Sequence, residues 1–296
     1  MKCLFLRKVL NNMEFDTIQL KRIAFILMLI DHVALYIPDI PIYFRWLGRI
    51  SMPLFLFCCV CGFDYTHDRK KYIFRLYVFS LITAVIQSIY NIDNNFILTI
   101  FSVVMLLEVI ELSKINQSIL FYYCVWQIVA LVVSLYFIQT SNANMETICF
   151  YIIPALTGSI FCLEGGFVYV ILGVLFYYFK SSKRKLALCF LLFDIGFFVC
   201  SQFHVFERLI YKLPYITING IYSVWDILLF LTECMGFSPN NMGGSLLFEN
   251  YQWMMIFSLP FLLFYNGKSR KIGKAEKMFY YWGYPLHLII LSGINI

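Results

Sequence analysis

Long runs of apolar residues, separated by short polar or basic turns, repeat along the whole chain. Each run is close to the ~20 residues that an α-helix needs to cross a bilayer. We expect spanning helices over residues 20–38, 44–63, 72–90, 96–112, 118–138, 165–179, 185–203, 248–265 and 278–295, with weaker candidates at 147–162 and 219–236. The pattern predicts an all-α fold, a polytopic transmembrane helical bundle of about 9–11 transmembrane helices.

Composition supports this fold class. Hydrophobic residues make up 61% of the chain and charged residues 14%, and the mean hydropathy is +0.77. A soluble domain carries about a quarter charged residues. We find no internal repeat and no linker, so residues 1–296 are expected to form a single integral-membrane domain, with 1–16 as a short cytoplasmic N-terminal segment. That segment is too polar to be the core of a signal peptide.

Basic residues collect in four short segments, and they predict orientation. The segments are the N-terminal one (Lys2, Arg7, Lys8, Lys21, Arg22), 67–71, 180–185 and 267–274. Nine spans with a cytoplasmic N-terminus place all four on the cytoplasmic side, whereas eleven spans move 180–185 outside. The sequence therefore predicts a multi-pass cell-membrane protein. The net charge of +6 comes from basic residues in these short turns. We interpret it as a sign of membrane topology and of contact with membrane lipids, and not of nucleic-acid binding.

The stretch LKRIAFILMLIDH (20–32) places Asp31 and His32 inside an apolar helix. An ionisable group at membrane depth costs at least ~2.5 kcal/mol, so the pair indicates function. Asp31 and Arg49 lie at similar depth on consecutive helices, and we predict that they form an ion pair. Adjacent helical residues diverge by ~100°, so Asp31 and His32 should not face each other. A buried His near a carboxylate can serve as a general base for an amine or hydroxyl that attacks an acyl donor.

Four further segments carry polar groups. They are RWLGRISMPLF (45–55), THDRKKYIFRL (66–76), LLFYNGKSRK (262–271) and YYWGYPLHL (280–288), the last of which buries His287. Clustered Arg and Lys can bind the phosphates of a donor such as acetyl-CoA. No glycine-rich phosphate loop, HExxH, GxSxG or kinase motif occurs. The Cys58–Cys61 segment (CCVC) is interpreted as small residues in an apolar helix, and no metal site is predicted.

Alternative interpretations stay open at this point. Basic turns can be simple positive-inside anchors, Arg75 can snorkel to the interface, and His287 can be a core histidine. A proton-coupled small-molecule transporter could use Asp31, His32 and His287 as relay residues. Such transporters often show two related halves, and we find no such symmetry. A non-catalytic partner of an export or conjugation system is the third possibility.

Five motifs, LKRIAFILMLIDH, LGRISMPLFLF with CGF, THDRKKYIFRL, LPFLLFYNGK and YPLHL, occur in the order in which they are found in the TraX family, and the chain resembles that family. TraX is a polytopic membrane protein that acetylates the N-terminus of F-type pilin. The resemblance covers residues 17–112 and 250–292, and it leaves 204–247 as an addition. It implies an acyl-CoA-dependent O- or N-acetyltransferase, with a peptide, pilin or sugar acceptor at or across the membrane.

The family is similar to wider groups of membrane acyltransferases that use cytoplasmic acyl-CoA and an intramembrane His. That similarity implies His32 as the general base with His287 as second choice, and Asp31 and Arg49 as supporting groups. It also implies that a set of polar residues lines the donor's way in, connected to His32 by a polar cavity. These residues are Lys21, Arg69, Lys70, Lys71, Arg75, Asn266 and Lys268.

Overall fold

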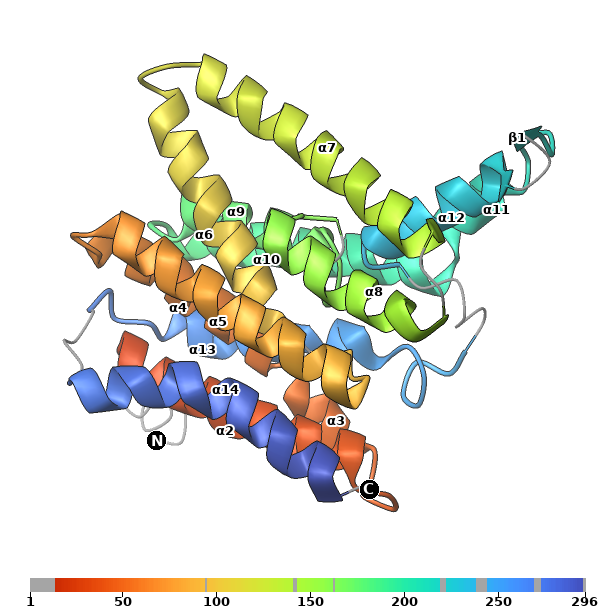
Figure 1. Ribbon diagram of the computed structural model, residues 1–296. Helices are drawn as coiled ribbons and strands as arrows, with labels where there is room; N and C mark the ends of the chain where they lie inside the picture. Colours follow the sequence, from red (N-terminus) through yellow and green to blue (C-terminus); the bar gives the residue numbers. More distant parts are fainter. Residues whose placement is uncertain are drawn as a thin grey trace.

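The computed structural model describes residues 14–93, 95–140, 143–161, 163–218, 222–237, 244–268 and 273–294. These residues form a bundle of helices with one short two-stranded ribbon (Figure 1). The described residues do not include Lys2, Arg7, Lys8 or 269–272, which the sequence predicts on the cytoplasmic side. The all-α prediction is confirmed, and each of the nine clearly expected spans coincides with helix.

In chain order the helices are α2 (Thr17–Tyr36), α3 (Tyr43–Gly48), α4 (Ser51–Tyr65), α5 (Arg69–Tyr90), α6 (Phe96–Ser113), α7 (Ser118–Thr140), α8 (Ala143–Thr157), α9 (Val168–Phe179), α10 (Lys183–Gln202) and α11 (Val205–Ile210). The strands β1 (Thr217–Ile218) and β2 (Tyr222–Ser223) follow, and then α12 (Val224–Cys234), the 3-10 helix η2 (Tyr251–Ser258), α13 (Leu259–Leu263) and α14 (Lys274–Ile294). Within the described residues, five helical segments are long and apolar enough to cross a membrane, namely Tyr43–Tyr65, Arg69–Tyr90, Phe96–Ser113, Ser118–Phe137 and Lys183–Gln202.

One end of the bundle, which we call the basic end, gathers the turns that carry Lys and Arg. The Lys180 ammonium lies 2.5 Å from the Asp64 carboxylate, which joins the end of α9 to the end of α4. Tyr65 donates a hydrogen bond to the Gly267 carbonyl (2.9 Å). Phe15 forms a parallel bridge with Tyr265, so the start of α2 lies there too. We call the other end, which contains residues 37–42 and 91–93, the far end.

Helix α8 dips into the bundle from the far end and does not cross it. Its last residues meet the middle of α7, where Gln127 donates to the Gly158 carbonyl (3.2 Å) and accepts from the Ile160 N–H (3.0 Å). The chain then returns towards the far end, where Thr99 in the first turn of α6 donates to the Glu164 carbonyl (3.2 Å). Helix α9 next runs to the basic end. The interpretation of 147–162 as a full span is therefore wrong.

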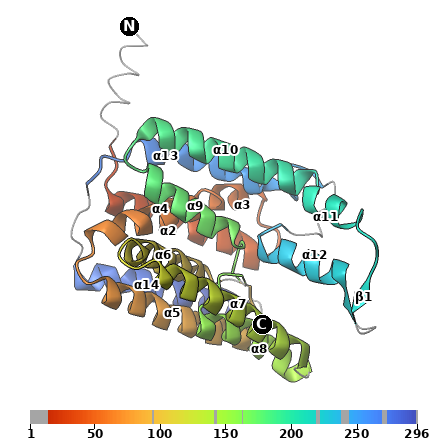
Figure 2. The ribbon, with the colours of Figure 1, turned by 90° about the horizontal axis from the view of Figure 1, so that it is seen from above.

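Helix α12 is also too short to cross. Its 11 residues rise about 16 Å, against a ~30 Å hydrocarbon core. It projects with α11 and the ribbon at the far end (Figures 1 and 2), and its end meets the start of α9 through the Phe167 N–H, which donates to the Cys234 carbonyl (2.9 Å). With α8 and α12 set aside, the described chain passes between the two ends in the segments α2, α3–α4, α5, α6, α7, α9, α10, η2–α13 and α14. Residues 180–185 thus share the basic end with 67–71, as the nine-span arrangement requires.

The apolar sequence of α4 explains its central position. Its Leu54, Phe57, Val60 and Phe63 side chains are fully buried, and the helix contacts α2, α6, α9 and η2. Helix α7 instead lies at the edge of the bundle and exposes large apolar side chains, among them Phe121 and Tyr122. In a membrane protein such a face meets lipid at no hydrophobic cost. The polar groups of the candidate site lie among other helices, namely α2, α3–α4, η2 and α14.

Candidate active site

Asp31 lies in the last two turns of α2, where that helix packs directly on α3. It is 7% exposed. The close approach depends on Gly48, because a Cβ at that position would lie 2.2 Å from the Asp31 Cβ and 2.3 Å from its Oδ1. The glycine in LGRIS thus lets the two helices bring a carboxylate to the arginines of α3.

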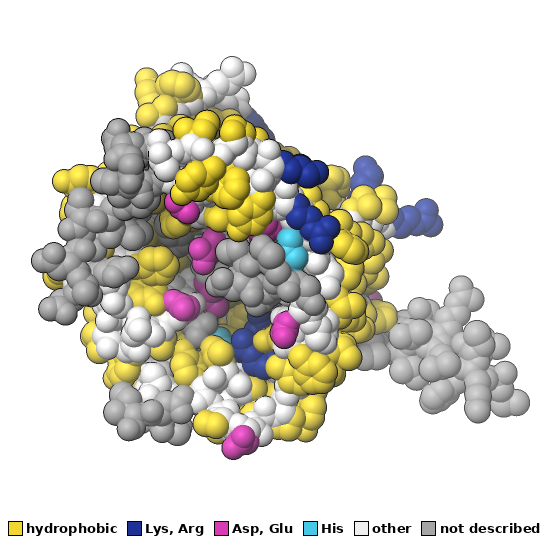
Figure 3. Space-filling model, turned by 90° about the vertical axis from the view of Figure 1, so that its right-hand side faces the viewer, with side chains coloured by type: hydrophobic (Ala, Val, Ile, Leu, Met, Phe, Trp, Pro, Cys, Tyr) yellow, Lys and Arg dark blue, Asp and Glu magenta, His cyan; other side chains and the backbone are white. Residues whose placement is uncertain are grey.

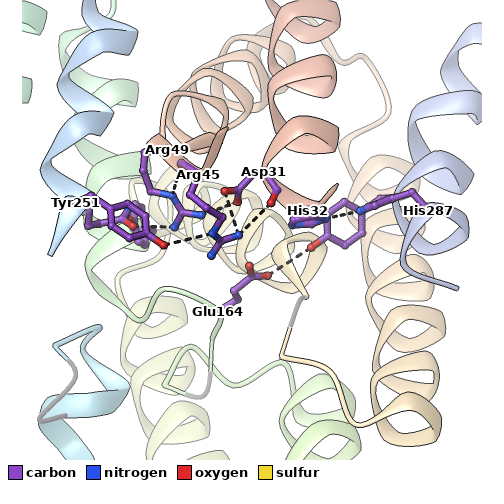
Figure 4. A network of polar contacts seen from close by, with 10 residues as sticks. Asp31, His32, Arg45, Arg49, Glu164, Tyr251 and His287 are labelled. Atoms are coloured by element: carbon purple, nitrogen blue, oxygen red, sulfur yellow. Dashed lines mark hydrogen bonds and ion pairs between the residues drawn. The ribbon is translucent and has the colours of Figure 1, made fainter. Parts of the chain in front are cut away.

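Two guanidinium groups hold the Asp31 carboxylate (Figure 4). Arg49 Nη2 lies 2.5 Å from Oδ2, and Arg45 Nη1 lies 3.0 Å from Oδ1 and also donates to the Asp31 carbonyl (3.2 Å). Residues four apart share one helix face, so both arginines reach the same partner. The predicted Asp31–Arg49 pair is confirmed. Arg45 is a further partner that the sequence interpretation did not assign to Asp31.

The helix η2 holds both arginines from the other side. Arg45 Nε donates to the Tyr251 hydroxyl (3.3 Å), and Arg49 Nη1 donates to Gln252 Oε1 (2.9 Å). Gln252 in turn donates to the Tyr169 hydroxyl on α9. One buried carboxylate thus faces two cations. Besides Asp31, each guanidinium donates to one neutral side chain of η2. The network joins α2, α3, α9 and η2, and it leaves a net positive charge beside His32.

His32 turns away from Asp31, as its position on the helix predicted, and it pairs with His287 of α14, a contact that the sequence did not predict. The two rings are stacked with centroids 4.8 Å apart, and His32 Nδ1 lies 2.5 Å from His287 Nε2. His287 Nδ1 lies 2.9 Å from the Gly283 carbonyl oxygen, which can only accept. His287 Nδ1 must therefore carry a hydrogen, so in the neutral pair His287 Nε2 accepts from His32 Nδ1–H. The lone pair of the His32 Nε2 atom is left for chemistry.

His32 lines a small cavity of about 60 Å³, and His287 does not. That volume holds one or a few water molecules or the reacting atoms of a small acyl group. The lining residues are Met28, Asp31, His32, Gly48, Arg49, Ser51, Met52, Phe96, Glu164, Gln252 and Tyr284. All of them come from the site network or the helix ends around it. The cavity thus brings a histidine, a guanidinium and a carboxyl group together around one small volume.

Glu164 reaches this cavity from the turn between α8 and α9. Two successive residues with positive φ, Gly165 (74°) and Gly166 (83°), turn the chain there, a backbone conformation that favours glycine. Tyr284, which lies edge-on to both histidine rings, donates to Glu164 Oε2 (3.4 Å) and accepts from the Phe96 N–H (2.9 Å). The E-G-G triplet after a broken apolar segment is the only sequence signal that could have pointed to this residue.

Two larger cavities adjoin the site and open toward the far end. One, of about 380 Å³, includes Glu164 and Gly165 with Asp93 and Glu233; the other, of about 210 Å³, includes Arg49, Gln252 and Gly165. Viewed from the far end, acidic side chains surround a hollow in the molecular surface (Figure 3). The site therefore connects more directly to the far end than to the basic end.

The residues expected to bind a donor lie at the basic end, in three separate places. Arg69 pairs with Glu108 (3.3 Å) and lies over the Phe63 ring. Lys70 and Lys71 are exposed, and Lys71 hydrogen-bonds to Asp68, which holds the pKa of the Asp68 carboxyl below its usual range. Asn266 and Lys268 lie beside the Phe15 and Thr17 backbones.

Lys21 and Arg75 form the third place, and they are considered further below. None of these residues lines the cavity beside His32, and Lys21 is eleven residues, or roughly 16 Å, from His32 along α2. The polar passage expected between the two sets is therefore not formed by that cavity. Within the described residues, no group of three His, Cys, Asp or Glu side chains could hold a metal ion. Cys58 and Cys61 are buried on α4.

The fold and the site together define a polytopic helical membrane protein with a buried histidine pair and a doubly bridged aspartate. The TraX protein family model matches residues 17–295, and the chain belongs to the TraX family. The matched range runs across residues 204–247 and extends beyond the two segments that carry the motifs.

One curated relative is a probable fimbrial assembly protein FimC, serogroup H1, of Dichelobacter nodosus. It is 38% identical over 76 residues, which cover 24% of this chain and 31% of that protein. The chain thus spans less than a third of that relative's length. No solved structure matches.

Proposed function

We propose that the protein is an integral-membrane acetyltransferase that moves an acetyl group from cytoplasmic acetyl-CoA to an amine or hydroxyl of an acceptor. The observation that carries the proposal is the His32–His287–Gly283 hydrogen-bond chain, which leaves the lone pair of His32 Nε2 free in a side chain that lines a small polar cavity. Membership of the TraX family supports the reaction class. The fimbrial relative supports a peptide or pilin-like acceptor.

In this mechanism His32 Nε2 removes the proton from the acceptor N–H or O–H as that atom attacks the thioester carbonyl carbon. The new N–C or O–C bond forms, the C–S bond breaks, and CoA leaves as a thiolate that takes up a proton. His287 fixes the His32 tautomer and stabilises the imidazolium through the same hydrogen bond. Asp31 is occupied by Arg45 and Arg49, so it serves as a positioning residue.

The lining of the cavity also suits the chemistry. The Arg49 guanidinium at the edge of this cavity can donate hydrogen bonds to the carbonyl oxygen as negative charge develops on it. A general base must be a neutral imidazole, and the hydrogen bond from His32 Nδ1–H to His287 leaves the His32 Nε2 atom with its lone pair. The basic end is assigned to the cytoplasm because Lys and Arg favour that side.

The test is acetyl transfer by the purified full-length protein in lipid nanodiscs, with radiolabelled acetyl-CoA and membranes of the source cells as the acceptor pool. We expect label in one peptide or glycan species. His32→Ala should lower the initial rate by about 10²–10⁴-fold, the usual contribution of a general base, and added imidazole should restore part of it. The matched control is His67→Ala, an exposed histidine at the basic end.

His287→Gln should lose less activity than His32→Ala, because the amide oxygen of Gln can still accept from His32 Nδ1–H. Equal rates for wild type and His32→Ala would overturn the assignment of the base. Proton uptake coupled to solute movement in proteoliposomes, with no acetyl transfer, would support the transporter instead.

A further inference from the structure

Three cations from three neighbouring helices converge at the basic end of the bundle. Two of these helices, α2 and α14, also carry His32 and His287. The cations are Lys21 of α2, Arg75 of α5 and Lys277 of α14. Within the part of the chain that the structure describes, none of the three forms an ion pair. Their convergence can be derived from the aromatic contacts that hold the three helices together.

Phe79 of α5 stacks on Tyr281 of α14, with ring centroids 5.0 Å apart. Arg75 precedes Phe79 by four residues and Lys277 precedes Tyr281 by four residues. Because α5 and α14 both run from the basic end to the far end, the two cations lie at the same level, one turn below the stacked rings.

Lys21 reaches this level by the same rule. It precedes Phe25 by four residues, and the Phe25 ring packs on Phe279 and Tyr280 of α14 at 5.1 and 5.9 Å. Lys21 and Arg75 both lie close enough to Lys277 to interact with it electrostatically. Like charges at this spacing repel one another, so an anion shared by the three cations would stabilise the cluster.

Arg75 adds a second observation. Its Nε–H is buried and has no hydrogen-bond partner, although Arg75 also lies against Tyr281. A guanidinium donor buried without an acceptor is costly unless a ligand supplies one, and phosphate oxygens fit its planar fork. By contrast, the neighbouring Arg22 is paired with Glu276 (2.9 Å) and is largely exposed.

We propose that Lys21, Arg75 and Lys277 form the binding site for the phosphate groups of the acyl donor. The inference rests on the proposed function for the identity of the donor. The histidine pair lies further along the same two helices, His32 eleven residues beyond Lys21 and His287 ten residues beyond Lys277, or roughly 15 Å. A nucleotide held at the cluster would extend its acyl-bearing arm along the contact between α2 and α14 toward His32.

The test compares two donors on the full-length protein in lipid-free detergent. One is acetyl-CoA, and the other is S-acetyl-N-acetylcysteamine, which carries the same thioester without phosphate. Lys277→Gln and Arg75→Gln should weaken acetyl-CoA binding about tenfold or more, and they should leave binding and turnover of the phosphate-free thioester unchanged. Arg22→Gln and Lys183→Gln, at two exposed basic residues outside the expected donor set, are matched controls and should bind acetyl-CoA within twofold of wild type.

The outcomes separate this proposal from the proposed function. If both Gln variants bind acetyl-CoA as wild type does, the cluster is not the donor site, even where acetyl transfer is observed. If they lose acetyl-CoA binding while neither thioester yields acetyl transfer, the phosphate site stands and the acetyltransferase does not. If the variants differ from wild type only in nanodiscs that contain phosphatidylglycerol, the cluster binds a lipid headgroup and the proposal is overturned.

Discussion

The doubly bridged Asp31 makes a prediction that a single ion pair would not make. Each of Arg45→Ala and Arg49→Ala removes one charged hydrogen-bond partner and leaves the other, so each should cost roughly 1.5–3 kcal/mol of stability. Removing both leaves a buried carboxylate without a cation. Removing the last cationic partner of a buried charge costs about 3–5 kcal/mol. Added to the loss of the first partner, this means that the double variant should lose about 4.5–8 kcal/mol of stability.

The sum of the two single losses is roughly 3–6 kcal/mol, so the double variant should exceed additivity by about 1.5–2 kcal/mol, a coupling typical of residues in one network. The decisive variant then adds Asp31→Asn to the double background. It removes the unpaired charge, and part of the lost stability should return. A simple loss of packing around the two arginines would give no such recovery.

The assay is the midpoint of thermal unfolding in detergent, followed by tryptophan fluorescence, where each kcal/mol corresponds to roughly 2–4 °C in a chain near this size. Arg22→Ala, at the exposed Arg22–Glu276 pair, is the control and should not shift the midpoint measurably. The reasoning is refuted if the double variant loses no more than the two single variants combined, or if Asp31→Asn in that background restores nothing.

Three further predictions follow from particular contacts. Gly48→Ala should cost about 1–3 kcal/mol, measured by thermal unfolding, because its Cβ would lie 2.2 Å from Asp31; Gly62→Ala, with nothing within 4 Å, should cause no loss. Gly236→Ala should be destabilising by the same assay, since Gly236 has φ 101° and its Cβ would lie 2.3 Å from the Gly165 carbonyl oxygen. A cysteine placed at Lys70 or Lys183 should react with a membrane-impermeant maleimide from one side of the membrane, and a cysteine at Asp39 or Lys212 from the other; reaction of positions 70 and 183 from opposite sides would contradict the path described for α8 and α9.

The sequence was sufficient to place the helices, because each apolar run is long enough to determine its own structure in a bilayer. It also predicted the Asp31–Arg49 pair, since two consecutive helices with charges at equal depth leave few other ways to bury them. Arg45 could have been included by the same argument, as it lies four residues before Arg49. These are local relations, and the spacing along a helix is enough to derive them.

The contacts that the sequence did not predict join distant segments. His32 and His287 are 255 residues apart, and nothing in either apolar run specifies that their rings meet. Glu164 reaches the site only because α8 turns back at Gly158 and because Gly165 and Gly166 adopt positive φ. Hydropathy treats 147–162 as a possible span because it measures apolarity and not whether a helix, once inserted, continues or returns.

The separation of the two ends has a consequence for how the chemistry can be dissected. The histidine pair and the cation cluster lie on the same helices, α2 and α14, but at different depths, and no described residue of the cluster lines the cavity beside His32. Substitutions at Lys277 or Arg75 should therefore change donor affinity with turnover at saturation preserved. Substitutions at His32 should change turnover with donor affinity preserved. Arg49→Lys at the site should behave like the His32 variants, because a lysine cannot both pair with Asp31 and donate to Gln252 in the same planar arrangement. A variant in either group that moves both quantities together would show that the two regions are energetically coupled through the packing of α2 on α14.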